Sequence, residues 1–138
     1  MRTPAAIEAE LDAFAPSADA PQRLLALAEE VLENWVVARG QEPTTEAVEG
    51  FRLLALHRQG ARGVPSFNAC SETCRELAYH YNLLAAEPGH ELAAQRQLMM
   101  TMLAKHLALF VSGKIEVEGL GEFCCAARPL RQETTVST

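Results

Sequence analysis

The chain has 138 residues, of which 49% are hydrophobic and 22% charged, with a formal net charge of −6 and a pI near 5.2. This composition is typical of a globular protein and argues against a disordered chain. The negative charge argues against nucleic acid or an anionic membrane as a partner, because both require a clustered positive field. A chain of this length can fold without a disulfide or a metal.

The N-terminal residues contain no apolar run of signal-peptide length. No later segment approaches the roughly 20 uninterrupted apolar residues of a membrane span. These features predict a cytoplasmic protein without membrane association, in which the four cysteines are reduced. We expect a single helical domain over residues 1–131 and a disordered polar tail over residues 132–138.

Two N-terminal segments have apolar residues at the spacing of amphipathic helices. The first begins at Pro4, a residue that suits the first helical position, and ends at Pro16. The second extends from Asp19 to Gly40, where a glycine is a normal helix stop. Its apolar stripe includes Trp35, which we interpret as a core residue.

Three further helices are predicted over residues 44–60, 67–86 and 90–113, with glycine and proline residues between them. The last of these helices is apolar over much of its surface. We therefore expect it to lie at the centre of a bundle or in a subunit interface.

The pattern changes after residue 113. Residues 114–118 alternate with a period of two, a turn follows, and residues 122–126 can return as a second strand. The predicted fold is therefore all-α: a four- to five-helix antiparallel bundle, with a short C-terminal β-hairpin or extended arm. The apolar surface of the last helix and the edges of the strands favour a homodimer.

Cys70 and Cys74 are four residues apart, so their sulfur atoms lie on one face of the fourth predicted helix. Leu77 and Tyr81 continue this face, which predicts that the cysteines point into the core. Free cysteine behaves as a small hydrophobic residue. Our first hypothesis is therefore a non-enzymatic accessory or protein-interaction protein with structural cysteines.

The second hypothesis is a metal-binding bundle, with zinc or another thiophilic metal as the ion. Cys70 and Cys74 can share one ion, and a four-coordinate structural ion needs two more ligands. His106 is the candidate third ligand because it lies in an apolar stripe of the last helix. Cys124 or Cys125 is the candidate fourth. The spacing is not that of a CxxC knuckle, so the motif is weakly specific.

The third hypothesis is a small thiol oxidoreductase in which Cys70 attacks and Cys74 resolves. Cys70 lies in the first turn of its predicted helix, where the helix dipole and free N–H groups stabilise a thiolate. The sequence does not decide between these three hypotheses, nor whether the protein is an enzyme.

The same helix start is a candidate anion site. Ser66, Asn68, Arg58 and Arg62 provide groups that bind a phosphate or a carboxylate. The alternative is a solvated loop whose arginines pair with the abundant glutamates, and this alternative is favoured on general grounds.

Overall fold

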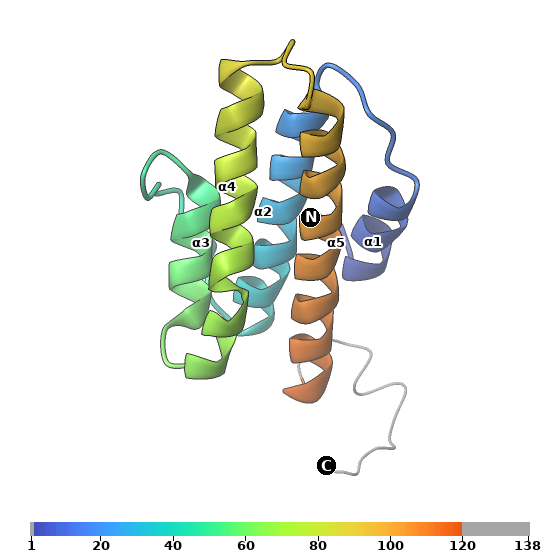
Figure 1. Ribbon diagram of the computed structural model, residues 1–138. Helices are drawn as coiled ribbons and strands as arrows, with labels where there is room; N and C mark the ends of the chain where they lie inside the picture. The colour runs from blue at the N-terminus through green and yellow to red at the C-terminus, as the bar shows by residue number, and fades with distance from the viewer. Residues whose placement is uncertain (1, 120–138) are drawn as a thin grey trace.

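The computed structural model describes residues 2–119, which form five α-helices and one 3₁₀ helix. The elements are α1 (Pro4–Asp12), α2 (Ala20–Ala38), α3 (Arg52–Ala61), η1 (Pro65–Cys70), α4 (Ser71–Ala86) and α5 (Ala93–Val117). Figure 1 shows α2, α4 and α5 packed together, with α3 beside α2 and α4, and with α1 beside α5. The predicted all-α bundle is confirmed.

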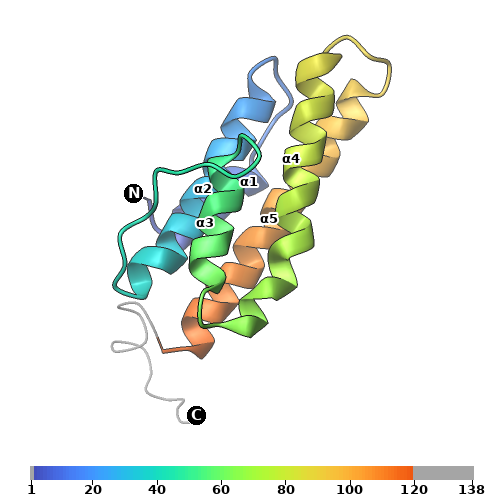
Figure 2. The same ribbon diagram turned by 90° about the vertical axis from the view of Figure 1, so that its left-hand side faces the viewer.

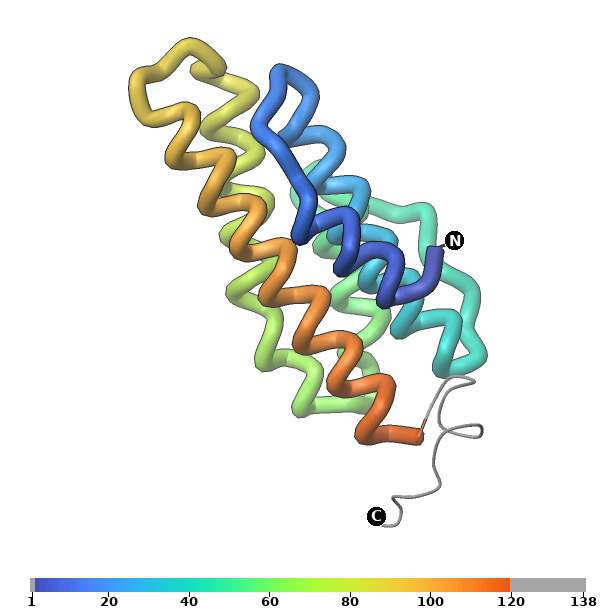
Figure 3. Tube along the Cα trace, turned by 90° about the vertical axis from the view of Figure 1, so that its right-hand side faces the viewer, coloured from blue at the N-terminus to red at the C-terminus, as the bar shows by residue number. Residues whose placement is uncertain are grey.

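The helices alternate in direction along the chain, with one exception (Figure 2). Consecutive helices run antiparallel, as predicted, except that α2 and α3 run parallel (Figure 2). The segment over residues 39–51 returns along the outside of the bundle, so that α3 begins beside the middle of α2. Figure 3 shows α1 lying along α5 in the opposite direction.

The third helix begins at Arg52, later than the predicted residue 44. Val48 and Phe51 exchange two backbone hydrogen bonds of 3.0 and 2.9 Å, which close a tight turn before the helix. The two central residues, Glu49 and Gly50, have φ angles of 54° and 85°. Two successive positive φ angles are typical of a type I′ turn, and a helix cannot pass through it.

The fourth predicted helix is divided in two. Residues 65–70 form the 3₁₀ helix η1, and the α-helix begins only at Ser71. The fifth helix extends further than predicted and ends at Val117. Residues 114–117, predicted as a strand, are therefore helical. Ile115 continues the buried face of α5 one turn after Val111, and this packing outweighs the local alternation. Residues 122–126 lie outside the described residues.

The core receives large side chains from every element. The largest fully buried ones are Ile7, Leu11, Leu24, Leu27, Leu32, Trp35, Leu53, Leu56, Phe67, Leu77, Met100 and Leu107. The prediction that Trp35 is a core residue is confirmed: its ring stacks on Phe67 with a centroid distance of 4.7 Å. Its Nε1 donates a hydrogen bond of 2.9 Å to the carbonyl of Gly60. Trp35 thus ties α2 to the junction of α3 and η1.

Among the described helices, α5 has the length and hydropathy of a segment that could cross a membrane. A core helix of a bundle has the same properties, and α5 packs against α1, α2 and α4. The finding is therefore compatible with the soluble protein expected from the sequence.

Candidate functional site

The candidate site lies where α3, η1 and α4 meet. Cys70 is the last residue of η1 and the N-cap residue of α4, and Cys74 follows one turn later. Their exposed fractions are 1% and 0%, and neither forms a disulfide. The prediction that both cysteines point into the core is confirmed.

His57 of α3 completes this cluster. Within residues 2–119 it is the one buried side chain that is polar or charged, with an exposed fraction of 7%. Its Nε2 lies 3.2 Å from the carbonyl oxygen of Phe67, and because this oxygen can only accept, Nε2 carries a proton. The imidazole and the Cys70 thiol are close enough that each shifts the pKa of the other. The Cys70 thiol donates to the same Phe67 carbonyl over 3.3 Å.

The surroundings of Cys70 favour its thiolate. The pKa of Cys70 is lowered from 9.0 to about 6, chiefly because the Cys74 thiol is hydrogen-bonded to it. The hydrogen bond and charge of His57 add to this effect and outweigh burial, which acts in the opposite direction. The pKa of Cys74 is raised, first by its hydrogen bond to Cys70 and then by burial. Cys70 is thus the thiol of the pair that ionises first.

The pKa of His57 is raised by the same cluster. Burial is the largest single effect and would lower the pKa. The hydrogen bond and charge of Cys70, together with the Phe67 carbonyl, outweigh it. A thiolate at Cys70 and an imidazolium at His57 therefore stabilise one another, as in other reactive cysteine sites.

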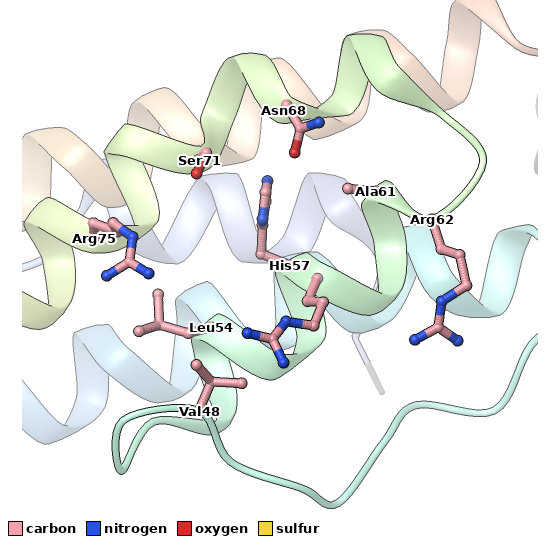
Figure 4. A pocket seen from close by; sticks show the side chains of 9 residues that line it. Val48, Leu54, His57, Ala61, Arg62, Asn68, Ser71 and Arg75 are labelled. Atoms are coloured by element: carbon pink, nitrogen blue, oxygen red, sulfur yellow. The ribbon is translucent and has the colours of Figure 1, made fainter.

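An open cleft of about 490 Å³ borders the cluster (Figure 4). Its walls are formed by Val48, Leu54, His57, Arg58, Ala61, Arg62, Asn68, Ser71 and Arg75. His57 lines this cleft and also contacts the Phe67 carbonyl to which the Cys70 thiol donates, whereas Cys70 itself does not line the cleft. His57 therefore connects the cleft with the thiol.

Three arginines give the cleft a positive charge. Arg75 forms an ion pair with Glu49 over 3.1 Å. The ion pairs within residues 2–119 include neither Arg58 nor Arg62. Among the described residues, Arg58 and Arg62 thus line the cleft without an ion pair, and the Glu49 carboxylate acts on Arg58 only through a longer-range Coulomb attraction.

The structure assembles most of the predicted anion site. Arg58, Arg62 and Asn68 line the same cleft. Ser66 does not line it, and its hydroxyl accepts a hydrogen bond of 2.6 Å from Lys114 of α5. Sequence reasoning missed Arg75, because the contribution of α4 depends on how this helix packs beside α3.

The predicted metal ligands are not brought together. His106 is exposed on the outer side of α5, whereas Cys70 and Cys74 are buried. α5 turns its Ala104 and Leu107 side toward the core, and this rotation directs His106 outward. The part of the chain that the structure describes contains no group of three potential metal ligands. Cys124 and Cys125 lie outside it.

Sequence reasoning also missed His57. The available signal was its spacing: it lies four residues after Leu53 and three after Leu54, within an apolar stripe. A polar side chain in the inward stripe of a helix needs a buried partner. That partner is the backbone carbonyl of Phe67 in η1.

No family model matches this chain, and no curated protein or solved structure was found to be similar to it. The geometry of the site is therefore the basis for a functional assignment.

Proposed function

We propose that this protein is a small thiol–disulfide oxidoreductase in which Cys70 attacks and Cys74 resolves. The observation that carries the proposal is the cluster at the start of α4, where His57 Nε2 and the Cys70 thiol lie 3.2 and 3.3 Å from the same Phe67 carbonyl oxygen and Cys74 follows one turn later. The lowered pKa of Cys70 supports it, because the thiolate is the nucleophile in disulfide exchange.

The first step is attack of the Cys70 thiolate on one sulfur of a small disulfide. The bond between the two substrate sulfurs breaks, a mixed disulfide forms on Cys70, and the other sulfur leaves as a thiolate. The His57 imidazolium can donate its proton to this leaving thiolate, because it lines the cleft beside Cys70.

The second step closes the protein disulfide. Cys74 loses its proton to His57 and attacks the Cys70 sulfur, the bond between Cys70 and the substrate sulfur breaks, and the leaving thiolate takes the proton from His57 and departs as the second thiol. The protein dithiol is oxidised by two electrons, and the substrate disulfide is reduced to two thiols. A dithiol reductant returns the protein to its starting state by the same exchange chemistry.

Both steps require local opening, because Cys70 is buried behind His57. The segment η1 is suited to this opening: it has 6 residues, whereas 3₁₀ helices longer than about 3–4 residues are uncommon and have poorer hydrogen-bond geometry. Disulfide formation also requires Cβ atoms about 3.5–4.5 Å apart, closer than the roughly 5–6 Å of this spacing in a regular helix. Cys70 precedes the first residue of α4, so η1 can move it toward Cys74.

The test uses the full chain with Cys124→Ser and Cys125→Ser, so that only Cys70 and Cys74 can react. In glutathione buffers of increasing oxidised fraction, we expect a reversible loss of two hydrogen atoms in the intact mass. Cys74→Ser should stop at the mixed disulfide with glutathione, and Cys70→Ser should not react. If the folded protein keeps both thiols at every ratio, and the denatured protein does not, the proposal fails and the cysteines are structural.

A second candidate is a protein-interaction module that forms a homodimer through the outer face of α5. Leu98, Met102 and Leu109 have exposed fractions of 61%, 56% and 64% and follow one another along this helix. Exposed apolar rows of this kind are typical of protein contacts. Sedimentation of the full chain should show a dimer that Leu98→Gln with Leu109→Gln converts to a monomer. A monomeric wild type at micromolar concentration would remove this candidate.

A further inference from the structure

The cleft beside the thiol pair presents cations from two walls. Arg58 and Arg62 are four residues apart on the last turn of α3 and the residue that follows it, while Arg75 comes from α4 (Figure 4). Like charges that share a cleft repel one another, and an anion bound between them removes this repulsion. Arginine is also the side chain that best matches a carboxylate or phosphate group, because its guanidinium donates two parallel hydrogen bonds.

Glu49 forms an ion pair with only one of these cations, Arg75, and attracts Arg58 at longer range. It lies at a positive φ of 54°, in the left-handed region that non-glycine residues adopt at a cost. In this position its carboxylate accepts hydrogen bonds of 3.1 and 3.3 Å from both terminal nitrogens of Arg75. The turn thus neutralises the α4 wall of the cleft, and the excess positive charge remains on the α3 side.

The size and the other walls of the cleft indicate an organic ligand. Its volume of about 490 Å³ falls within the roughly 300–1,000 Å³ of small-molecule sites and exceeds what an inorganic ion requires. Val48, Leu54 and Ala61 provide apolar surface for carbon atoms. Asn68 and Ser71 provide polar groups on the side that faces His57.

We infer that this cleft binds the disulfide substrate and that the substrate is a small organic disulfide carrying anionic groups. The inference rests on the proposed function, because it places the substrate beside His57, which shares the Phe67 carbonyl with the Cys70 thiol. The anionic groups bind Arg58 and Arg62, and the disulfide lies toward His57. The protein therefore discriminates between disulfides by charge.

The kinetic test compares two probe disulfides on the chain with Cys124→Ser and Cys125→Ser. One probe, 5,5′-dithiobis(2-nitrobenzoate), carries two carboxylates, and the other, 4,4′-dithiodipyridine, is uncharged. Arg58→Gln with Arg62→Gln should slow the reaction of the anionic probe about tenfold, an effect of the size expected for electrostatic steering, and leave the rate of the uncharged probe within about twofold. Arg23→Gln with Lys105→Gln removes the same charge from exposed sites outside the cleft and should change neither rate.

A binding test separates this inference from the proposed function. 2-Nitrobenzoate contains the carboxylate but no disulfide, and it should shift the backbone amide signals of Asn68 and Ser71, whereas 2-nitrobenzamide should not. If neither disulfide reacts with the folded protein but 2-nitrobenzoate binds, the thiol chemistry fails and the anion site stands. If both disulfides react and the cleft arginines affect neither rate, the anion site is overturned and the thiol chemistry stands. If neither disulfide reacts and 2-nitrobenzoate does not bind, both are overturned.

Discussion

Two histidines in this protein have similar sequence surroundings and opposite environments. His57 of α3 is buried against η1, where it meets Phe67 and Cys70. His106 of α5 is exposed on the outer side of the bundle. Each lies among apolar residues at helical spacing, so sequence spacing alone assigns both to the core.

The two helices differ in how polar and apolar residues are distributed around the helix axis. α3 has a polar side that contains Arg58 and Gln59, which leaves one face for the core. α5 is apolar almost all round, with Leu98 outside and Met100 inside. When a helix has no polar face, the position of its neighbours decides which apolar residues are buried. A histidine in such a helix is therefore weak evidence for a buried site.

The largest expected difference between the two regions is in how much one side chain contributes to the free energy of unfolding through packing. Phe67 is fully buried and its ring lies against Trp35, His57 and Phe110. Phe67→Ala should lower the free energy of unfolding by about 3–5 kcal/mol, because a large cavity remains. Leu109→Ala should change it by less than about 0.5 kcal/mol, because that side chain is exposed. Urea unfolding measures both. Similar values for the two variants would contradict the contrast between an inner cluster and an outer face.

Two helical glycines provide a second comparison. A Cβ atom at Gly60 would lie 2.7 Å from Cδ1 of Trp35 and 3.1 Å from Cε2 of Phe67, whereas at Gly113 it would meet nothing within 4 Å. Gly60→Ala should therefore destabilise the protein by about 1–3 kcal/mol through overpacking. Gly113→Ala should stabilise it by about 0.5–1 kcal/mol through helix propensity.

Thermal or urea unfolding of the two alanine variants decides this prediction by sign. If both variants are stabilised, α3 and η1 move apart at little cost to make room for the added methyl group at position 60. In that case the reaction of Cys70 with a disulfide should be as fast in Gly60→Ala as in the wild type.

Replacing each histidine separately tests whether His57, and not His106, affects the reactivity of Cys70. His57→Gln removes the imidazolium that helps lower the pKa of Cys70, so the thiolate fraction at pH 7 should fall. A rise of about one unit in the pKa of Cys70 lowers the thiolate fraction only from about 0.9 to about 0.5 at pH 7, so the reaction with 4,4′-dithiodipyridine should slow by about twofold at pH 7 and by about fivefold at pH 6. His106→Gln should leave the rate unchanged. An equal rate in all three proteins would remove His57 from the proposed mechanism.

The smallest expected effect is a pH dependence of stability. The pKa of Cys70 is lowered from 9.0 to about 6, so the folded protein holds fewer protons than the unfolded chain between these values. The contribution of Cys70 to the free energy of unfolding is therefore fully present above pH 9, and it is lost as the pH falls through about 6. The raised pKa of His57 acts in the opposite sense: its contribution is present below 6.5 and is lost as the pH rises through the folded value.

The raised pKa of Cys74 removes stability only above its ordinary value of 9.0. The wild type should therefore gain stability relative to Cys70→Ser between pH 5 and pH 8, by about 1 kcal/mol. Urea unfolding of both proteins under reducing conditions measures this difference. A constant difference across this range would indicate that Cys70 stays protonated in the fold.

Several local features were predictable because their causes are local. Pro4 and Gly40 mark the start of α1 and the end of α2, and the apolar stripe identified Trp35 as a core residue. The late start of α3 was not predicted from apolar spacing, because the turn before it is closed by Val48 and Phe51 and is also held by distant partners. Thr44 donates its backbone N–H to the Gln59 side chain, and Glu49 pairs with Arg75.

By itself, the sequence determined that the protein is helical and that Cys70 and Cys74 point into the core, because both follow from the spacing of the apolar residues. Only the tertiary structure decided that His57, and not His106, lies beside these thiols. It also decided that Arg75 joins Arg58 and Arg62 around one cleft. Both juxtapositions depend on how α3 packs against η1 and α4, and no local pattern in the chain encodes that packing.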